Sequence, residues 1–420
     1  MKFKSEFLAK LKELWDQKIV KYAIILHIFY FILALALFFM FYKEKNDFII
    51  FYNAGDIFIN DINNLYNQSN YLWDFRYFPL SALFFIPFSI MSFELAFVIF
   101  NLFNLLLNIL ISLIVYRIII LVRFKNHEKD NKRVIVYICV YLMGLPHILN
   151  YVYGQINSYI TLFILISLYI FIKYQEIKWQ FIGSLFLGIS ILIKPTAIFL
   201  IPFLIVLKFD WERKRFNFEF STSIVRLIGV VLPVALNFIL FFMYPPLWKG
   251  FLETNFTGSN PVALNFSYSI SKLIINFCYF FNIPFNQILI LIVNICIIGG
   301  LGFIIFILRR KDNNSIIYGF AFGIIIMLLA YYDSWNHHLL NLIPILIIII
   351  FSLPRNSIKT KPIKTSLIFF SFFDLAFVGI WYLVYPLFPF NFEGTFFLLV
   401  CFYAFYKYLV KKEIPNPTEG

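Results

Sequence analysis

The sequence predicts an all-α polytopic membrane protein, a single bundle of about twelve transmembrane helices with interfacial helices in its outer loops. Hydrophobic residues make up 61% of the 420 residues and charged residues only 14%, which is too apolar for a soluble globular chain of this length. The apolar runs that recur from Val20 to Val410 are continuous. Strands of a membrane barrel would instead alternate, so helices are the expected spanning elements.

The first element expected is a helix at 1–19 that lies in the inner membrane interface. This segment is long and charged and has no small-residue cleavage site before the first apolar run, so it does not fit a cleaved signal peptide. Its apolar residues fall on one helical face between lysines: Phe3, Phe7, Leu8, Leu11, Leu14 and Trp15.

Hydropathy and the distribution of lysine and arginine then predict twelve crossings, with both termini cytosolic. Residues 1–410 form one integral-membrane domain and 411–420 a cytosolic tail. The run 181–207 is divided at Lys194-Pro195, because proline and charge balance both favour a break there. The run 79–91 is too short for a comfortable crossing, so we expect a re-entrant or interfacial segment. The predicted spans are 20–42, 92–116, 134–149, 157–172, 181–193, 195–207, 223–244, 285–308, 315–331, 338–353, 366–388 and 394–410.

With this topology the net charge of +13 is explained by orientation and by attraction to anionic lipid, and no nucleic-acid partner is needed. We therefore expect a multi-pass protein of the cell membrane. All but six of the 35 basic residues fall on the inner side; the six outer ones are Lys43, Lys45, Arg76, Lys194, Lys249 and Lys272.

The outer side carries the candidate chemistry, in two long loops at 43–78 and 245–284 and in short turns at 153–157, 194–196 and 333–338. ATP and nucleotide sugars are not available at that face, so a reaction there needs another activated donor. No metal site and no cofactor are expected, because the four cysteines lie in or beside apolar runs and the five histidines are scattered.

Several short motifs in this order resemble glycosyltransferase family 87, the polyprenyl-phosphate-mannose-dependent transferases, over about 47–344. The first is Asp47-Phe48-Ile49-Ile50-Phe51-Tyr52-Asn53-Ala54-Gly55, followed by Leu65-Tyr66, Phe75-Arg76-Tyr77-Phe78-Pro79-Leu80 and Pro87. The later ones are Gly154-Gln155-Ile156-Asn157, the glycines Gly183 and Gly188 with Lys194-Pro195-Thr196, and Ser334-Trp335-Asn336-His337-His338. The long outer loop departs from the family pattern, since Asn265-Phe266-Ser267-Tyr268-Ser269 matches its Asn-Gln-Ser-Leu element only in part.

The resemblance implies a C-class glycosyltransferase fold, a lipid-linked donor such as mannosyl phosphoryl polyprenol, and transfer on the extracytosolic side. The expected partners are membrane lipid, the polyprenyl-phosphate-linked sugar and a glycolipid or glycan acceptor. A sugar on a lipid phosphate has its anomeric carbon at headgroup depth. The enzyme then needs an apolar groove, cations for the phosphate and a base beside the acceptor hydroxyl.

Asp47 is the candidate catalytic base. A carboxylate just beyond a span and packed against aromatic residues is partly desolvated, which raises its proton affinity and suits it to accept a hydroxyl proton. The alternative is a solvated acid at a helix end. Asp56 is a candidate acceptor-sugar contact, or else a cap of an interfacial helix.

Lys194 and Arg76 are the candidate phosphate partners, because a leaving phosphate gains charge as the glycosidic bond breaks. Lys194 has the alternative of a lysine snorkelling from a helix end, and Arg76 of a structural pair with Asp74. His337 and His338 are further candidates for the phosphate, although adjacent histidines on a helix point in different directions, so only one is expected to face the site.

Four neutral side chains complete the candidate site. Gln155 and Asn157 offer hydrogen bonds to sugar hydroxyls, with the satisfaction of a broken helix end as the alternative. Tyr52 and Trp335 offer ring faces for a pyranose, although aromatic residues are common at membrane interfaces.

The function predicted is the transfer of a hexose from a polyprenyl-phosphate donor with inversion at the anomeric carbon. Mannose is the first candidate for the hexose. Two other classes stay open. A lipid or solute transporter should show related halves and ionisable groups at mid-membrane depth, of which Asp374 is the one clear acid. A lipid-linked glycan ligase would share the outer-face site and transfer a preassembled chain.

Overall fold

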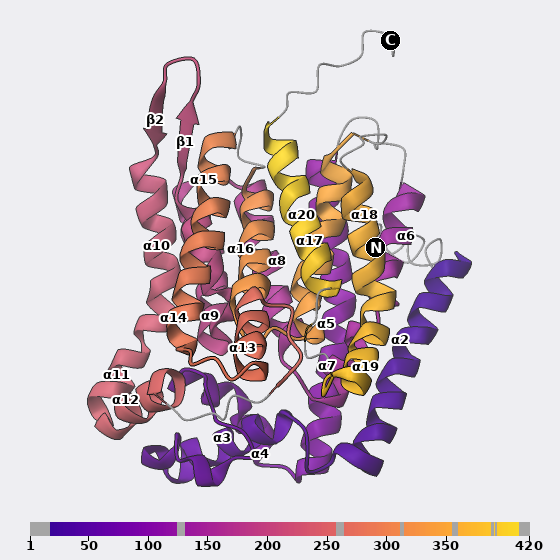
Figure 1. Ribbon diagram of the computed structural model, residues 1–420, viewed down its shortest axis with the longest axis vertical. Coiled ribbons are helices and arrows are strands. Elements are labelled where there is room, and N and C mark those ends of the chain that lie inside the picture. The colour runs from indigo at the N-terminus through magenta and orange to yellow at the C-terminus, as the bar shows by residue number, and fades with distance from the viewer. Residues whose placement is uncertain are drawn as a thin grey trace, which may run out of the picture.

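The computed structural model describes residues 17–123, 131–257, 264–310, 315–354, 360–387, 390 and 393–410. Within these ranges the chain forms a bundle of helices that run roughly along one direction, with shorter elements gathered at one end (Figure 1). The predicted interfacial helix at 1–19 lies almost wholly outside the described residues, and so does the tail at 411–420.

The first half of the chain contributes the indigo and purple elements of Figure 1. In order they are α2 (Lys18–Leu37), η1 (Phe38–Tyr42), α3 (Phe48–Asn60), η2 (Ile62–Asn64), η3 (Gln68–Asn70), η4 (Pro79–Phe85), α4 (Ile86–Ser89), α5 (Phe93–Val122), α6 (Asn131–Leu142), α7 (Pro146–Val152), α8 (Asn157–Lys173), α9 (Ile177–Ile193) and η6 (Pro195–Leu204).

A strand pair and further helices follow. They are β1 (Leu207–Asp210), β2 (Arg215–Phe218), α10 (Phe220–Ala235), α11 (Asn237–Met243), α12 (Pro245–Leu252), η7 (Glu253–Thr257), α13 (Ile270–Phe280), α14 (Gln287–Asn294), η8 (Ile295–Gly299), α15 (Gly300–Arg309), α16 (Ile316–Ala330), η10 (Asn336–His338), α17 (Leu339–Ser352), α18 (Thr360–Ile368), η11 (Phe369–Phe373), α19 (Asp374–Val384) and α20 (Glu393–Val410).

Five continuous helical segments in the described part of the chain are long and apolar enough to cross a membrane, and α6 with α7 makes a sixth if this pair, bent by 40°, is one span. This agrees with a polytopic helical membrane protein. Several other apolar helices are shorter, so the count of twelve crossings stays a prediction. The five are Lys18–Tyr42, Phe93–Val122, Phe220–Met243, Gln287–Leu308 and Thr360–Val384.

The break predicted at Lys194-Pro195 is confirmed, since α9 ends at Ile193 and a tighter 3₁₀ helix, η6, begins at Pro195. Proline lacks the amide hydrogen that a continuing helix would need. At about 2 Å per residue, the ten residues of η6 reach only ~20 Å, less than the hydrocarbon thickness.

One element departs from the all-helical expectation. The basic segment after η6 forms an antiparallel hairpin in which Leu207 pairs with Phe218 and Asp210 with Arg215. The Asp210 carboxylate accepts hydrogen bonds from the backbone N–H groups of the next turn, and Lys214 closes that turn with a φ of 47°. The Asp210 side chain therefore stabilises the turn that joins the two strands.

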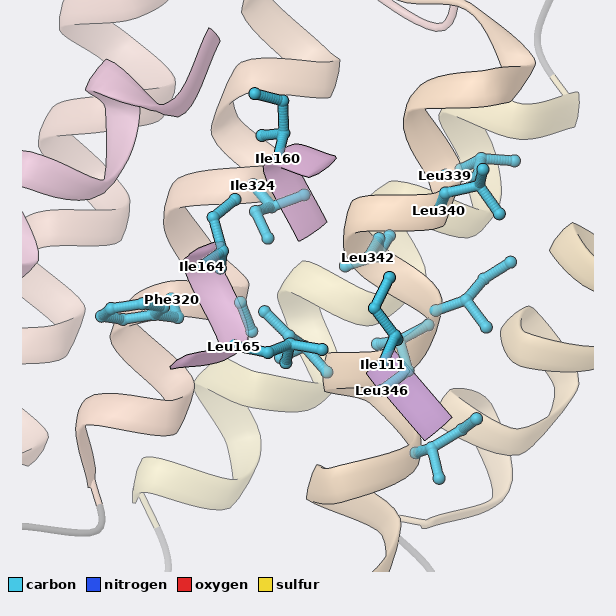
Figure 2. Close-up of a cluster of buried hydrophobic side chains, with 14 of the residues drawn as sticks. Ile111, Ile160, Ile164, Leu165, Phe320, Ile324, Leu339, Leu340, Leu342 and Leu346 are labelled. Carbon is cyan, nitrogen blue, oxygen red and sulfur yellow. The ribbon is translucent and has the colours of Figure 1, made fainter. Parts of the chain in front are cut away.

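The core lies among α8, α16 and α17. Every residue of α16 is buried, and so are most residues of α8 and α17. A helix that is apolar on all sides is expected in the middle of a membrane bundle. Figure 2 shows the packing: Ile164 of α8 lies toward Phe320 and Ile324 of α16, and Ile111 of α5 toward Leu346 of α17.

The two ends of the bundle differ. The β1–β2 hairpin lies at one end, and α3, α4 and α12 lie across the other (Figure 1). We name these the hairpin end and the α3 end. Pro79–Ser89, the segment predicted to be re-entrant or interfacial, lies with α3 at the second end. The chain direction also brings the C-terminus of α9 and the N-terminus of α8 to the α3 end.

Glycines allow α9 and α10 to approach closely. A Cβ atom on Gly188 of α9 would lie 2.5 Å from the carbonyl oxygen of Val230, and one on Gly229 of α10 would lie 2.7 Å from Cβ of Ser184. Small residues at such crossings let helix backbones meet in lipid.

Substitution of Gly188 by valine should push these helices apart and lower the free energy of unfolding by about 1–3 kcal/mol. The midpoint of thermal unfolding in detergent measures the effect. Gly379→Val is the matched control, because a Cβ atom there meets nothing within 4 Å. Equal midpoints for the two variants would contradict close α9–α10 packing.

Candidate active site

Asp47 stands at the start of α3, where the backbone is tied to a distant turn. The backbone N–H groups of Asp47 and Phe48 both donate to the carbonyl oxygen of Tyr153, at 3.0 and 3.1 Å. The preceding residue, Asn46, accepts from the N–H of Ile49 at 3.1 Å, as a residue capping a helix does. The position of Asp47 is therefore fixed by main-chain bonds on both sides.

The turn that holds Asp47 depends on Gly154, which has a φ of +60°. A Cβ atom at this glycine would lie 2.5 Å from Cβ of Phe48. The next residue, Gln155, donates its N–H to the carbonyl of Asn150 at 2.8 Å and accepts from the Asn104 amide at 3.3 Å. The Gly-Gln-Ile-Asn segment is thus a packed turn and not a free loop.

Four predicted site residues meet in one hydrogen-bonded chain. The Gln155 side-chain amide donates to the Asp47 carboxylate, and its oxygen accepts from the Lys194 ammonium at 3.3 Å. Lys194 also donates to the Asn157 side-chain oxygen at 3.0 Å. Asp47 is half-buried and the other three are buried. We call these four hydrogen-bonded side chains, of Asp47, Gln155, Lys194 and Asn157, the Asp47–Asn157 chain; the name does not refer to the residues between 47 and 157.

Burial shifts both ionisable groups of this chain toward their neutral forms. Removal from water raises the pKa of the Asp47 carboxyl to about 6, and the Gln155 hydrogen bond and the Lys194 charge oppose the shift. Burial lowers the pKa of the Lys194 ammonium to about 7, and Asp47 opposes it. Both groups therefore change protonation near neutral pH.

His337 and His338 lie beside this chain. Both are buried, and the charge of Lys194 acts on both imidazole rings. His338 Nδ1 accepts from the backbone N–H of Trp335 at 3.0 Å, so in the neutral ring the proton is on Nε2. Among the described residues the two histidines do not join a third His, Cys, Asp or Glu in a group that could hold a metal ion.

Arg76 is paired with Asp333, a partner that the sequence analysis did not assign. Its Nη1 donates to the Asp333 carboxylate at 2.8 Å. Burial raises the pKa of Asp333, and the positive charges of Arg76 and Lys272 oppose the shift. The charges of Asp47, Arg76 and Asp333 all act on the Tyr77 phenol, which puts the Arg76–Asp333 pair near the Asp47–Asn157 chain.

Three candidate sugar contacts lie outside this chain. Asp56 is exposed and accepts from Asn60 at 3.0 Å, about 13 Å further along α3 than Asp47 at 1.5 Å per residue. Tyr52 donates its hydroxyl to the carbonyl of Met91 at 2.7 Å. Trp335 is half-buried and comes directly before η10. We call residues 334–338, which include His337 and His338, the histidine turn.

A second buried carboxylate, Asp374, also supports the histidine turn. It accepts hydrogen bonds from the Tyr268 hydroxyl and the Asn336 side-chain amide. Tyr268 lies in the long loop and donates its N–H to the carbonyl of Ser334 at 3.1 Å. The sequence marks Asp374 as an acid within an apolar run, but gives no signal for these partners.

Comparison with known families gives a match over the middle of the chain. The family model of glycosyltransferase family 87 matches residues 75–331, more than half of the chain. No curated protein and no solved structure matches the chain.

Alanine at Gly154 should destabilise the turn that carries Gln155. The left-handed backbone alone costs about 1–2 kcal/mol for a residue with a Cβ atom, and contact with Phe48 adds to that cost. Thermal unfolding in detergent measures it against Gly300→Ala, a helical glycine with nothing within 4 Å of its Cβ position. A midpoint for Gly154→Ala as high as for the control would show that the turn can be rebuilt without strain.

Proposed function

Since the chain belongs to glycosyltransferase family 87, and is thus a membrane glycosyltransferase, we propose that it moves a hexose from a polyprenyl-phosphate donor to a lipid- or glycan-linked acceptor. Mannose is the first candidate for this hexose. The observation that carries this proposal is the Asp47–Asn157 chain. It brings a carboxylate of raised pKa and a buried cation to the two sides of one amide group. A base for a hydroxyl and a positive charge for a leaving phosphate are what such a transfer needs.

In the proposed reaction, Asp47 takes the proton of the acceptor hydroxyl while the acceptor oxygen attacks the anomeric carbon. The bond between that carbon and the phosphate oxygen breaks, and polyprenyl phosphate leaves with the bonding electrons. This single displacement inverts the anomeric carbon, so a β-linked donor gives an α-glycoside. No cofactor takes part in these steps.

The cations have different starting positions in this proposal. Lys194 donates to the neutral side-chain oxygens of Gln155 and Asn157, so its charge can act on the leaving phosphate, with His337 and His338 beside it. Arg76 already faces Asp333. It would contact the donor phosphate either by leaving that carboxylate or by binding both groups at once.

The sugar contacts follow from the same geometry. Gln155 lies between Asp47 and Lys194, and Asn157 lies on the other side of Lys194, so both amides would contact a pyranose placed beside Lys194. Tyr52, Trp335 and Asp56 would contact the outer part of the acceptor, since they lie outside the Asp47–Asn157 chain.

The side of the membrane is part of the proposal. The Asp47–Asn157 chain is bonded to the start of α3 through Asp47, and α3 lies at the end of the bundle opposite the hairpin with Arg213, Lys214 and Arg215 (Figure 1). Basic residues favour the cytosol. We place the hairpin end and both termini in the cytosol, and the reaction on the extracytosolic side of the cell membrane.

Asp47→Asn should keep the fold and lower transfer by about a hundredfold or more, because an amide cannot accept the hydroxyl proton. The assay follows a labelled sugar from purified polyprenyl-phosphate donor to acceptor in proteoliposomes. Asp61→Asn, an exposed acid at the end of α3, is the control and should stay near wild type. Full activity of Asp47→Asn would remove Asp47 as the base. Label that only changes leaflet would indicate a transporter, and transfer of a whole glycan would indicate a ligase.

The rate should also depend on pH in a bell shape. Transfer needs Asp47 deprotonated, so kcat/KM for the donor should rise with pH through about 6, the raised pKa of that carboxyl. It also needs Lys194 protonated, so kcat/KM should fall as pH passes about 7, the lowered pKa of that ammonium. Lys194→Arg should retain the acid limb and lose the alkaline one, because a guanidinium stays charged. An alkaline limb unchanged in that variant would contradict the role of Lys194.

A further inference from the structure

Several buried polar side-chain atoms have no hydrogen-bond partner among the described residues, and two of them are N–H donors near the Asp47–Asn157 chain. They are Nδ2 of Asn150 and Nε2 of His338. Asn150 is 0% exposed and His338 3% exposed. A buried donor without a partner costs free energy, so a pair of them at a candidate active site points to an absent ligand.

Both donors belong to the neighbourhood of Lys194. Asn157, which accepts from Lys194, donates its own amide to Oδ1 of Asn150 at 3.2 Å. This bond uses the oxygen of Asn150 and leaves the N–H groups of its amide available. The helix of Asn150, α7, packs directly against the turn of His338, η10.

The tautomer of His338 adds to the same pattern. Its Nδ1 already accepts from Trp335, so the free Nε2 carries a proton when the ring is neutral. Lys194 has three N–H donors and makes two hydrogen bonds to side-chain oxygens. Together Asn150, His338 and Lys194 present donors and one positive charge.

A ligand that fits such a set accepts several hydrogen bonds and carries negative charge, as a phosphate group does. A sugar hydroxyl fits less well, since it also has a proton to donate. Oδ1 of Asn336, on the same turn as His338, is an acceptor without a partner among the described residues, which suits a hydroxyl group of the donor sugar.

We propose that Asn150 is a phosphate-binding residue, and that it forms, with His338 Nε2 and Lys194 Nζ, the site for the phosphate group of the lipid-linked donor. This inference rests on the proposed function and adds a residue to it. It also gives the two cations different positions: Lys194 belongs to the phosphate site as the structure stands, whereas Arg76 faces Asp333 and would reach the donor only by a change at that ion pair.

The test measures phosphate binding apart from catalysis. Purified protein in detergent is titrated with farnesyl phosphate, with farnesol and with inorganic phosphate, and the thermal midpoint gives the apparent Kd. Asn150→Leu removes the donors at similar size. Asn294→Leu is the matched control, since Asn294 is a buried asparagine that bonds to its own helix at Ile290.

Farnesyl phosphate should stabilise the wild type and the control, farnesol should do so less, and Asn150→Leu should bind farnesyl phosphate about tenfold or more weakly. Inorganic phosphate that binds as tightly as farnesyl phosphate would identify a free-anion site instead and overturn the lipid-donor assignment. Equal Kd values for wild type and Asn150→Leu, with sugar transfer intact in the wild type, would overturn the inference and leave the proposed function standing. A wild type that neither binds farnesyl phosphate nor transfers sugar would remove the proposed function itself.

If Asn150→Leu unfolds, Asn150→Asp supplies the second measurement. The substitution keeps the size and the Oδ1 acceptor for Asn157, and it replaces the donor by an oxygen that repels phosphate. Its Kd for farnesyl phosphate should rise about tenfold or more above that of the wild type. A Kd equal to that of the wild type would overturn the inference.

Discussion

The site depends on one amide side chain, that of Gln155, which separates a carboxylate from an ammonium. An isolated charge buried in a low-dielectric environment is costly, and a direct ion pair would hold both groups permanently ionised. With an amide between them, each charge is stabilised by a dipole and by the other charge at longer range. Burial is then the largest influence on both groups and brings the pKa of Asp47 to about 6 and that of Lys194 to about 7, where a base can accept a proton and a cation can still be charged.

Much of the surrounding fold keeps that amide in place. α5 carries asparagines at 101, 104 and 108, spaced so that they share one face of the helix. Asn101 donates to the carbonyl of Tyr151 and Asn104 to that of Gln155. Asn108 bonds the Tyr151 hydroxyl, which also contacts His27 of α2. A polar row inside an apolar helix thus satisfies the backbone of the broken segment before α8, as buried polar groups in membrane proteins require.

The sequence predicted the class of fold and the members of the Asp47–Asn157 chain because their signals are local. Hydropathy is a sum over neighbouring residues, and the Gly-Gln-Ile-Asn and Lys-Pro-Thr segments are short motifs next to apolar runs. The hairpin at 207–218 was missed because a basic segment with aromatic residues reads as an ordinary inner loop. Pairs of residues far apart in the sequence, such as Arg76 with Asp333 or Tyr268 with Asp374, are brought together by helix packing. They produce no spacing pattern in the sequence. The same holds for Asn150, which is one polar residue in an apolar run until α7 packs against the histidine turn.

The histidine turn has two kinds of neighbour, the residues near Lys194 and the long loop at 264–269. α7 packs against the turn and the charge of Lys194 acts on both of its histidines, and the loop at 264–269 is bonded to Ser334 and, through Tyr268, to Asp374. The long loop is where the chain departs from the family pattern that its other motifs follow. The loop bonds to the backbone of Ser334, whereas the bonds that join Asp47, Gln155, Lys194 and Asn157 involve no residue of the loop. The loop therefore acts on the turn at Ser334, and Lys194 acts on it at His337 and His338.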